Sequence, residues 1–254
     1  MRRILPARAA TLTSVPALAT VLATVLAAAP AARAQMLGLP VVQTPFGGRA
    51  FALALDAGGG GNGIGTAGLA VAARNGGSRI VGTLGIGALR GFANTRPSFG
   101  GRVAYLFPFG ASGSFAVAPF VGAGAVSAGD QAKQQRSTSG RPVLGGSVTI
   151  IPAGVGVGYR RAVAGHAVAV HLTPHVQYWR AGVPDADATH GTYVRVGVGL
   201  DAALTRQLGL AVAAEGGRAS DVVGTGSAAT GLAQGPRTTL FGVALSYTPR
   251  RARR

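Results

Sequence analysis

The stretch Tyr193-Val194-Arg195-Val196-Gly197-Val198-Gly199-Leu200-Asp201 decides the fold class of this chain. Its aliphatic residues all fall on even positions, whereas the arginine, the aspartate and the two glycines fall on odd ones. Side chains that alternate in this way are typical of a β-strand with one apolar and one polar face. The same period of two recurs over residues 168–178 and 239–247. Alternating segments of about ten residues, separated by turn residues, are the pattern of a transmembrane β-barrel.

The alternation begins near Phe46 and predicts ten strands. We expect them near residues 48–57, 64–74, 79–90, 99–109, 114–126, 144–160, 165–180, 192–204, 208–217 and 237–248. Short connections (75–78, 110–113, 161–164 and 205–207) alternate with longer ones (58–63, 91–98, 127–143, 181–191 and 218–236). Outer-membrane barrels have short periplasmic turns, longer outer loops and an even number of strands. The sequence therefore predicts an all-β fold, a single transmembrane antiparallel up-and-down β-barrel of about ten strands, with eight as the alternative.

The hairpin of strands 144–160 and 165–180 carries two further expectations. Val148 and Ile150 lie on even positions, whereas the valines after Pro152-Ala153-Gly154 lie on odd ones, which predicts a bulge at this tripeptide. At about 3.3 Å per residue the hairpin is roughly 50 Å long. Because the apolar band of a barrel is roughly 25 Å tall, we expect the hairpin to project beyond the membrane surface.

The composition favours a barrel that faces lipid over a soluble one. Of the 254 residues 48% are hydrophobic and 42 are glycine, but only 12% are charged, about half the share in a typical soluble domain. A soluble lipocalin-like barrel or sandwich with so few charges would expose a large apolar surface and aggregate. The chain contains no cysteine, so we expect neither disulfides nor a thiolate metal site.

The chain is strongly basic, with a formal net charge of +17. Its basic residues are scattered singly between apolar segments, and only residues 250–254 form a cluster. Nucleic-acid-binding proteins gather their charge into a patch or stripe, so we expect no nucleic-acid partner. A basic exterior that faces anionic lipopolysaccharide is the functional interpretation, and a compositional bias toward arginine is the alternative.

The N-terminal segment has the three parts of a secretory signal peptide. Arg2, Arg3 and Arg8 give a positive start, residues 12–29 are small and apolar, and Ala32-Arg33-Ala34 supplies a small-x-small cleavage site. We expect cleavage between Ala34 and the next residue, with an uncleaved anchor as the alternative. The predicted organisation is a signal peptide (1–34), a periplasmic lead-in (35–47), the barrel (48–248) and a basic tail (249–254).

The last predicted strand carries an assembly signal. Phe241, Val243, Leu245 and Tyr247 resemble the alternating, aromatic-ended last strand by which the assembly machinery recognises outer-membrane proteins. Together with the signal segment, the chain resembles small bacterial outer-membrane barrels of the OmpA-like and opacity-porin-like type over roughly residues 46–248. The resemblance implies outer-membrane localisation, with membrane lipid, lipopolysaccharide and the barrel-assembly machinery as partners. Those families usually have eight strands and end on the aromatic residue, and this chain departs from both patterns.

No pattern of cofactor-binding residues stands out. The glycine-rich residues 58–65 lack the Lys and Ser/Thr with which a phosphate-binding loop ends. His171 and His175 would lie roughly 13 Å apart along one strand, too far to share a metal. We therefore expect no cofactor and no metal.

An acidic loop near Trp179 invites comparison with an enzyme. Asp185, Asp187 and His190 follow this tryptophan, and omptin proteases are ten-stranded barrels with acidic and histidine catalytic residues near the outer rim. A water-activating site of that type needs a second acid or histidine from another strand, and only seven acids exist in the whole chain. We expect no enzyme, with an omptin-like protease as an alternative.

The inward face of the predicted barrel is the remaining candidate site. Its polar residues are Arg102, His171, His175, Gln177, Arg195, Asp201 and Glu215, and most other inward positions are glycine or alanine. A barrel of about eight strands is just filled by ordinary side chains, so ten strands lined by small residues leave room for water. Arg195 and Glu215 are expected as diagonal neighbours on adjacent strands, which suits an ion-paired plug.

Two functions remain open at this point. The first is a non-enzymatic barrel with a structural or surface-interaction role through the outer loops 127–143, 181–191 and 218–236. The alternative is a narrow passive porin-like channel with a slight anion preference, given by the lumen arginines. The sequence predicts no oligomeric state.

Overall fold

The computed structural model describes residues 51–60, 65–74, 78–91, 94–110, 113–126, 147–183, 186–223 and 240–248. The strands within these ranges are β1 (Phe51–Gly60), β2 (Gly65–Arg74), β3 (Ile80–Gly91), β4 (Asn94–Tyr105), β5 (Phe107–Phe109), β6 (Phe115–Val126), β7 (Ser147–Val163), β8 (His166–Val183), β9 (Ala186–Ala203), β10 (Leu208–Val223) and β11 (Leu240–Tyr247). Among these residues no helix is long and apolar enough to cross a bilayer. The predicted cleavage site at Ala32 and Ala34, the lead-in 35–47 and the tail 249–254 lie outside the described residues.

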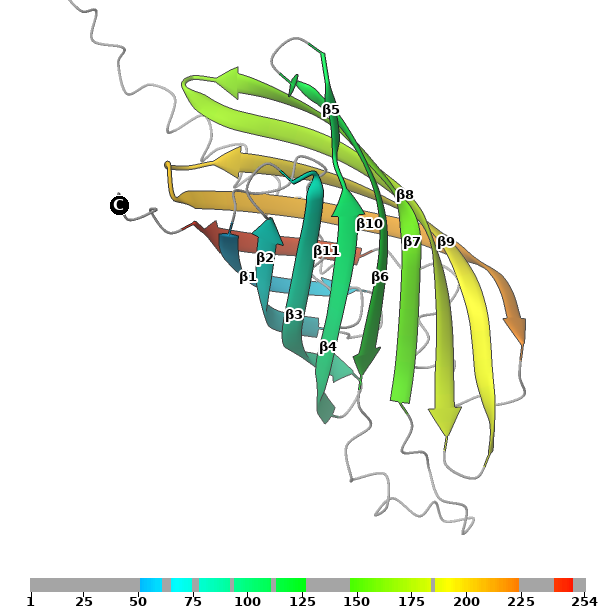
Figure 1. Cartoon of the computed structure of the whole chain (residues 1–254). Helices are drawn as coiled ribbons and strands as arrows, with labels where there is room; N and C mark the ends of the chain where they lie inside the picture. The colour runs from blue at the N-terminus through cyan, green and yellow to red at the C-terminus, as the bar shows by residue number, and fades with distance from the viewer. Residues whose placement is uncertain are drawn as a thin grey trace, which may run out of the picture. The chain divides into compact units, whose positions relative to one another are not determined.

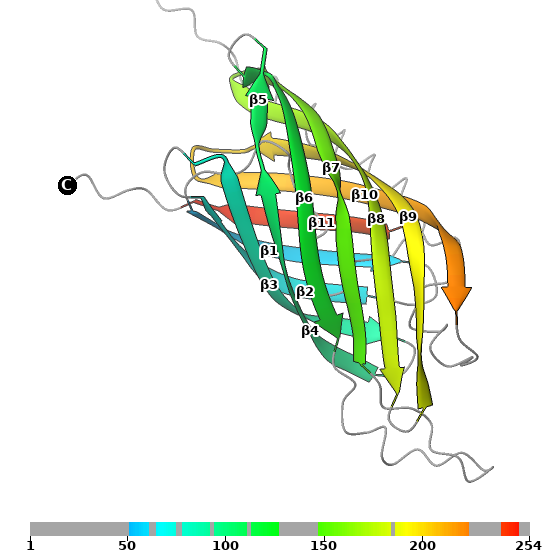
Figure 2. The same ribbon diagram turned by 45° about the vertical axis from the view of Figure 1, so that its right-hand side comes forward.

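The strands form one antiparallel sheet that closes on itself (Figures 1 and 2). β1 pairs with β11, and β4 pairs with β6. β5 continues β4 after Leu106 and keeps the same register with β6, so the two segments make one strand of the barrel. The predicted ten-stranded barrel is therefore confirmed, and the alternative of eight strands is wrong. Closure pairs backbone groups that would otherwise face lipid unsatisfied.

The pairing register sets the tilt of the strands. When the ladder partners are followed once around the barrel from Leu55, the path returns to β1 about 12 residues from its start. With strands about 4.8 Å apart and about 3.3 Å per residue, this stagger gives a tilt of about 40° and a backbone radius of about 10 Å. Transmembrane barrels have tilts in this range.

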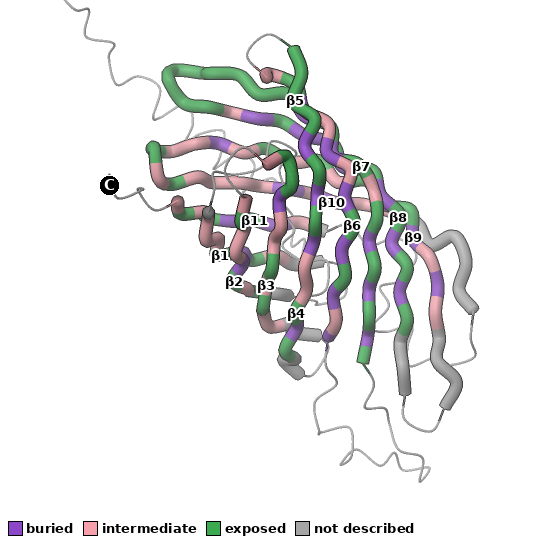
Figure 3. Tube along the Cα trace, in the orientation of Figure 1, coloured by how far each residue is buried: buried purple, intermediate pink, exposed green. Residues whose placement is uncertain are grey.

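Large apolar side chains cover the outside of the barrel. Leu84 is 70% exposed, Ile86 65% and Leu55 63%. The inside of the barrel holds buried charged residues, which are Asp56, Arg102, Arg195 and Glu215, and Arg195 is only 2% exposed. Figure 3 shows the alternation of buried and exposed positions along the strands. A soluble barrel has the opposite arrangement, so this exterior is that of a barrel in lipid.

The apolar exterior forms a belt of limited height. On β8 it runs from Val170 to Tyr178, which at a tilt of about 40° spans roughly 20 Å along the barrel axis. Exposed aromatic residues gather at the end with the short turns: Tyr105, Phe107, Phe109, Phe115, Tyr159 and Tyr247. The rings of Phe115 and Tyr159 lie 4.9 Å apart. Aromatic girdles of this kind mark the level of the membrane interface.

The β7–β8 hairpin is longer than the belt, in line with the length predicted for it. β7 has 17 residues and β8 has 18, whereas about ten residues cross a bilayer at this tilt. Residues 161–167 at the turn are all exposed. The hairpin therefore extends past the belt.

The predicted bulge at Pro152-Ala153-Gly154 is wrong. Buried and exposed residues alternate across the proline without a change of phase, and β7 keeps one register with each neighbour. The β6–β7 ladder skips Pro152 and resumes unchanged, because a proline removes a donor without shifting the chain. Val148 and Ile150 point into the barrel instead, and each is only 3% exposed.

Two of the predicted long loops are mostly strand. Only residues 92–93 separate β3 from β4, and only residues 184–185 separate β8 from β9. Backbone pairing needs no apolar side chains, so strands continue beyond the belt after the alternating pattern has ended. The two longer separations between strands, 127–146 and 224–239, lie outside the described residues.

Candidate functional site

The structure places the seven predicted lumen side chains inside the barrel. Arg102 lies on β4, His171, His175 and Gln177 on β8, Arg195 and Asp201 on β9, and Glu215 on β10. All are buried except Asp201, which is half-buried. β8, β9 and β10 are neighbours in the sheet, whereas β4 is separated from β8 by β6 and β7. Two groups of contacts follow from this arrangement.

The first group, here named the central cluster, consists of His175, Arg195 and Glu215. Arg195 Nε donates a hydrogen bond to Glu215 Oε1. His175 Nε2 lies 3.5 Å from the same carboxylate oxygen. The other ring nitrogen, Nδ1, lies 3.1 Å from the carbonyl oxygen of Thr173. Because a carbonyl only accepts, Nδ1 carries a proton, and the imidazole is fixed beside the carboxylate.

The second group is Arg102 with Phe120. The guanidinium carbon of Arg102 lies 3.6 Å from the centre of the Phe120 ring. The Phe120 ring in turn lies 6.0 Å from the ring of His175. Arginine stacked on an aromatic face gains a cation–π interaction, which is strengthened when water is excluded. Phe120 therefore links Arg102 to the central cluster.

A glycine lies across the ladder from each of five lumen side chains. The pairs are Arg102 with Gly122, His171 with Gly199, His175 with Gly154, Arg195 with Gly217 and Glu215 with Gly197. A Cβ atom at Gly199 would collide with the His171 ring, and one at Gly217 would lie 2.7 Å from Arg195 Cγ. The His171 ring and the Arg195 stem thus lie over a neighbouring strand, in space that only glycine leaves open.

Several polar atoms in the lumen need water. His171 Nε2 lies 3.7 Å from Asp201 Oδ2, beyond hydrogen-bond length. Neither ring nitrogen of His171 has a hydrogen-bond partner within the described part of the chain, and Gln177 Oε1 has none there either. Buried polar groups are nearly always satisfied by protein or by ordered water. The lumen around His171 and Gln177 therefore has to be hydrated.

The lumen has one smooth wall and one crowded wall. β1, β2, β3, β10 and β11 contribute mostly small inward residues: Ala52, Ala54, Ala70, Ala72, Gly85, Gly87, Ala211, Ala213, Gly242 and Ala244. β6 to β9 contribute larger ones: Phe120, Pro152, Thr173, His175, Gln177, Trp179, Tyr193 and Arg195. Free space is therefore expected beside the smooth wall.

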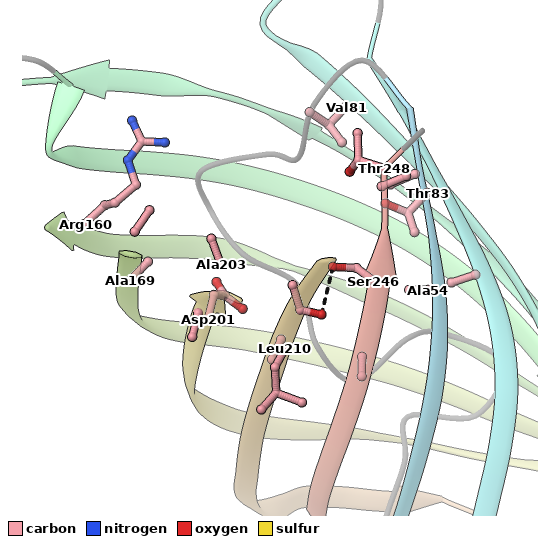
Figure 4. Close-up of a pocket in the computed structure, with 18 of the residues that line it drawn as sticks. Ala54, Val81, Thr83, Arg160, Ala169, Asp201, Ala203, Leu210, Ser246 and Thr248 are labelled. Carbon is pink, nitrogen blue, oxygen red and sulfur yellow. Dashed lines mark hydrogen bonds between the residues drawn. The ribbon is translucent and has the colours of Figure 1, made fainter. Parts of the chain in front are cut away.

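A cavity of about 290 Å³, here named the vestibule, lies at the short-turn end of the barrel (Figure 4). Alanine is its commonest lining residue, and the charged residues among those that line it are Arg102, Arg160 and Asp201. Ser246 also lines it and donates a hydrogen bond of 3.2 Å to the Gly209 carbonyl oxygen. The central cluster does not line the vestibule, and its residues lie farther along the strands toward the outer end.

The residues compared with an omptin site are not brought together among those described. Trp179 is buried inside the barrel, where its ring stacks 6.1 Å from that of Tyr193. His190 lies instead 6.2 Å from the ring of exposed Tyr178. Asp185 and the side chain of Asp187 lie outside the described residues. Within the described ranges no group of three His, Cys, Asp or Glu side chains could hold a metal ion.

The predicted assembly residues lie on the seam where the barrel closes. β11 pairs with β1 on one side and β10 on the other. Val243, Leu245 and Tyr247 are exposed on the outside of this strand, and Phe241 is half-buried. Their recognition by the assembly machinery stays a prediction.

Sequence reasoning missed several lumen residues, including Asp56 and Phe120. Asp56 is buried on the inner face of β1, and its alternation with Leu53 and Leu55 was the signal that could have revealed it. Phe120 is also inward and only 7% exposed. Ala116 and Ala118 lie at alternate positions on the same strand, so the sequence could have shown that Phe120 points inward. The sequence could not have shown its contact with Arg102.

Comparisons with known proteins give distant structural matches and no sequence match. No protein-family model and no curated sequence matches the chain. Among solved structures, the KdgM porin is 10% identical, with a TM-score of 0.39, 78% of this chain and 99% of that chain covered. The β domain of the Bordetella autotransporter BrkA is 14% identical, with a TM-score of 0.46 and coverage of 78% and 98%. The translocator domain of NalP from Neisseria meningitidis is 14% identical, with a TM-score of 0.40 and coverage of 78% and 86%. At these values the likeness adds no argument about function, which rests on the lumen and the exterior.

Proposed function

We propose that this chain is a non-enzymatic outer-membrane barrel, closed to ion flow at rest, with a structural or surface-interaction role at its outer end. The central cluster is the observation that carries the proposal. A guanidinium, a carboxylate and an imidazole meet there at mid-height in a barrel of about 10 Å backbone radius. Ion-paired groups of this kind hold their own geometry and leave no charge for a permeating ion to exchange with.

The outer end supports the closed state as well. Trp179 and Tyr193 stack inside the barrel on the outer side of the central cluster. Val148 and Ile150 are buried on the same side. Aqueous channels are lined by polar side chains, so an aromatic and aliphatic lining at this level favours a plug over a pore.

The surface role rests on strand length. β8, β9 and β10 contain 18, 18 and 16 residues, and the outward apolar residues of β8 end at Tyr178. The strands beyond that level stand outside the lipid. Arg180 and His190 pair there across the β8–β9 ladder, which gives the outer hairpin a polar outward face that lipopolysaccharide or a surface partner can contact.

A narrow passive channel with a slight anion preference is the second candidate. The hydrated surroundings of His171 and Gln177 favour it, as does the smooth wall of glycine and alanine. In such a channel Arg102 and Arg195 would set the anion preference.

Planar-bilayer conductance of the refolded protein separates the two. The wild type is expected to show no discrete steps, whereas Arg195→Ala/Glu215→Ala, which removes the ion pair across the lumen, is expected to gain them. Arg79→Ala/Arg161→Ala, which removes two exposed charges at the short-turn end, is the control and should stay silent. Discrete steps in the wild type, with anion preference lost in Arg195→Glu, would establish the channel instead.

The orientation is testable because the chain has no cysteine of its own. A cysteine placed at exposed Arg180 should react with a large, membrane-impermeant maleimide on intact cells. One placed at exposed Arg161, at the turn of the β7–β8 hairpin, should react only after the outer membrane is opened. The reverse pattern would contradict the proposed surface role.

A further inference from the structure

The feature that the closed barrel does not explain is Arg102 at the wall of the vestibule. This residue is only 8% exposed. Within the described part of the chain it forms no ion pair and no side-chain hydrogen bond, and its guanidinium lies on the face of Phe120. Arg195, by contrast, has Glu215. Arg102 is thus a buried cation whose partner is not a carboxylate of the described chain.

The chemistry of the guanidinium indicates which ligand it can bind. Phe120 covers one face of the planar group, but its five N–H donors lie in the plane and point away from the ring. No guanidinium nitrogen of Arg102 is among the fully enclosed side-chain atoms of the described residues that lack a partner, so its donors face open space and not the protein. Because Arg102 lines the vestibule, an acceptor can reach these donors from the vestibule.

The charges around the vestibule select a single negative charge. Its lining contains Arg102 and Arg160 as cations and Asp201 as an anion. A monoanion balances this set, whereas a dianion would meet repulsion from Asp201. A carboxylate also matches the planar fork of arginine in two parallel hydrogen bonds.

The remaining lining fits an apolar body. Ala52, Ala54, Ala70 and Ala72 come from β1 and β2, and further alanines come from β8 and β11. At native packing density the volume of about 290 Å³ holds a molecule of about ten non-hydrogen atoms. Ligand sites generally combine an apolar lining with a few polar groups that fix orientation.

We propose that the vestibule binds a small monocarboxylate with an unbranched apolar chain of about six to eight carbons, entering from the periplasmic side. The carboxylate pairs with Arg102 and the chain lies along the alanine wall. This inference is independent of whether the barrel conducts, because the vestibule lies on the periplasmic side of the central cluster.

The probe is sodium hexanoate, titrated by saturation-transfer NMR against the barrel in phosphatidylcholine nanodiscs, with empty nanodiscs subtracted for lipid partition. Saturable binding of hexanoate is expected, and 1-hexanol, which lacks the charge, should bind at least about 10-fold more weakly. Equal binding of hexanoate and hexanol would overturn the proposal.

Three variants locate the site. Arg102→Met removes the charge but keeps a side chain that can pack on Phe120, and is expected to weaken hexanoate binding about 10-fold or more. Ala72→Phe fills the vestibule but keeps the charge of Arg102, and should abolish saturable binding. Arg79→Gln, an exposed arginine at the same end that does not line the vestibule, should bind as the wild type does. Each variant is first shown to fold by its shifted mobility on unboiled SDS gels. Unchanged binding in either of the first two variants refutes the site.

Discussion

The central cluster should behave as one energetic unit. The perturbation is Glu215→Leu, alone and combined with Arg195→Met, since both replacements keep roughly the original volume. Glu215 is 6% exposed and Arg195 is 2% exposed. The single change leaves a buried guanidinium without its acceptor and leaves His175 without its neighbour. Removing one partner of a buried ion pair costs about 3–5 kcal/mol, and water near the cluster places the expected loss at about 3 kcal/mol.

The double variant tests the reasoning. Arg195→Met alone leaves Glu215 beside His175 and is expected to cost about 2 kcal/mol. With both charges gone nothing is left unpaired, so the double variant should cost no more than about 2 kcal/mol, which gives a coupling energy of about 3 kcal/mol.

The assay is reversible urea unfolding of the barrel in lipid vesicles, followed by tryptophan fluorescence. Trp179 is the only tryptophan in the chain and is 1% exposed, so its emission should shift on unfolding. Additive losses in the two single variants, with no coupling, would refute the ion-paired plug and leave two independent lumen charges.

Three further outcomes follow from the exterior and the lumen glycines. Val196→Arg puts a charge on the lipid face and should destabilise the barrel by about 2–4 kcal/mol, whereas Ala162→Arg in the exposed β7–β8 turn should change stability by less than about 0.5 kcal/mol. Gly199→Val should displace the His171 ring and cost about 1–3 kcal/mol in the same unfolding assay. Gly216→Ala, whose new methyl group would meet nothing within 4 Å, should be nearly neutral. Unboiled protein should migrate differently from boiled protein on SDS gels, and equal mobility with solubility in the absence of detergent would contradict the membrane barrel.

Most of the barrel could be predicted because its faces follow from one period. The stretch at 193–201 separates lipid-facing valines from inward Arg195 and Asp201, and the structure keeps that separation. The predicted bulge at residues 152–154 was wrong because, beyond the apolar belt, the polarity of a side chain no longer indicates whether it points into the barrel or outward. Val148 and Ile150 are apolar yet inward, so a change in their parity was misinterpreted as a bulge. Beyond the belt, inward and outward positions still alternate along the strand, but inward residues are no longer polar and outward residues are no longer apolar as a rule.

Much less of the candidate site could be predicted. The alternation of polar and apolar positions along each strand was enough to identify inward charged residues, including Arg195 and Glu215. This alternation does not give the register with which strands pair, so it could not show that the guanidinium of Arg102 lies on the ring of Phe120. The vestibule was equally hidden, because it depends on alanines from strands that are far apart in the sequence.

The glycines opposite the lumen side chains connect the plug with the vestibule. Gly199 and Gly217 leave space on the wall itself, and His171 and Arg195 occupy that space. A polar side chain that lies flat over a glycine of the neighbouring strand stays close to the barrel wall and does not extend to the barrel axis. The barrel can therefore hold such side chains at mid-height without filling its whole width. The remaining free space is the vestibule at the short-turn end, where most inward residues are alanine. Replacing Gly217, which lies opposite Arg195 in the central cluster, with a larger residue should therefore push Arg195 toward the axis and narrow the lumen at mid-height. The vestibule and its hexanoate binding should stay unchanged, because Arg195 does not line the vestibule.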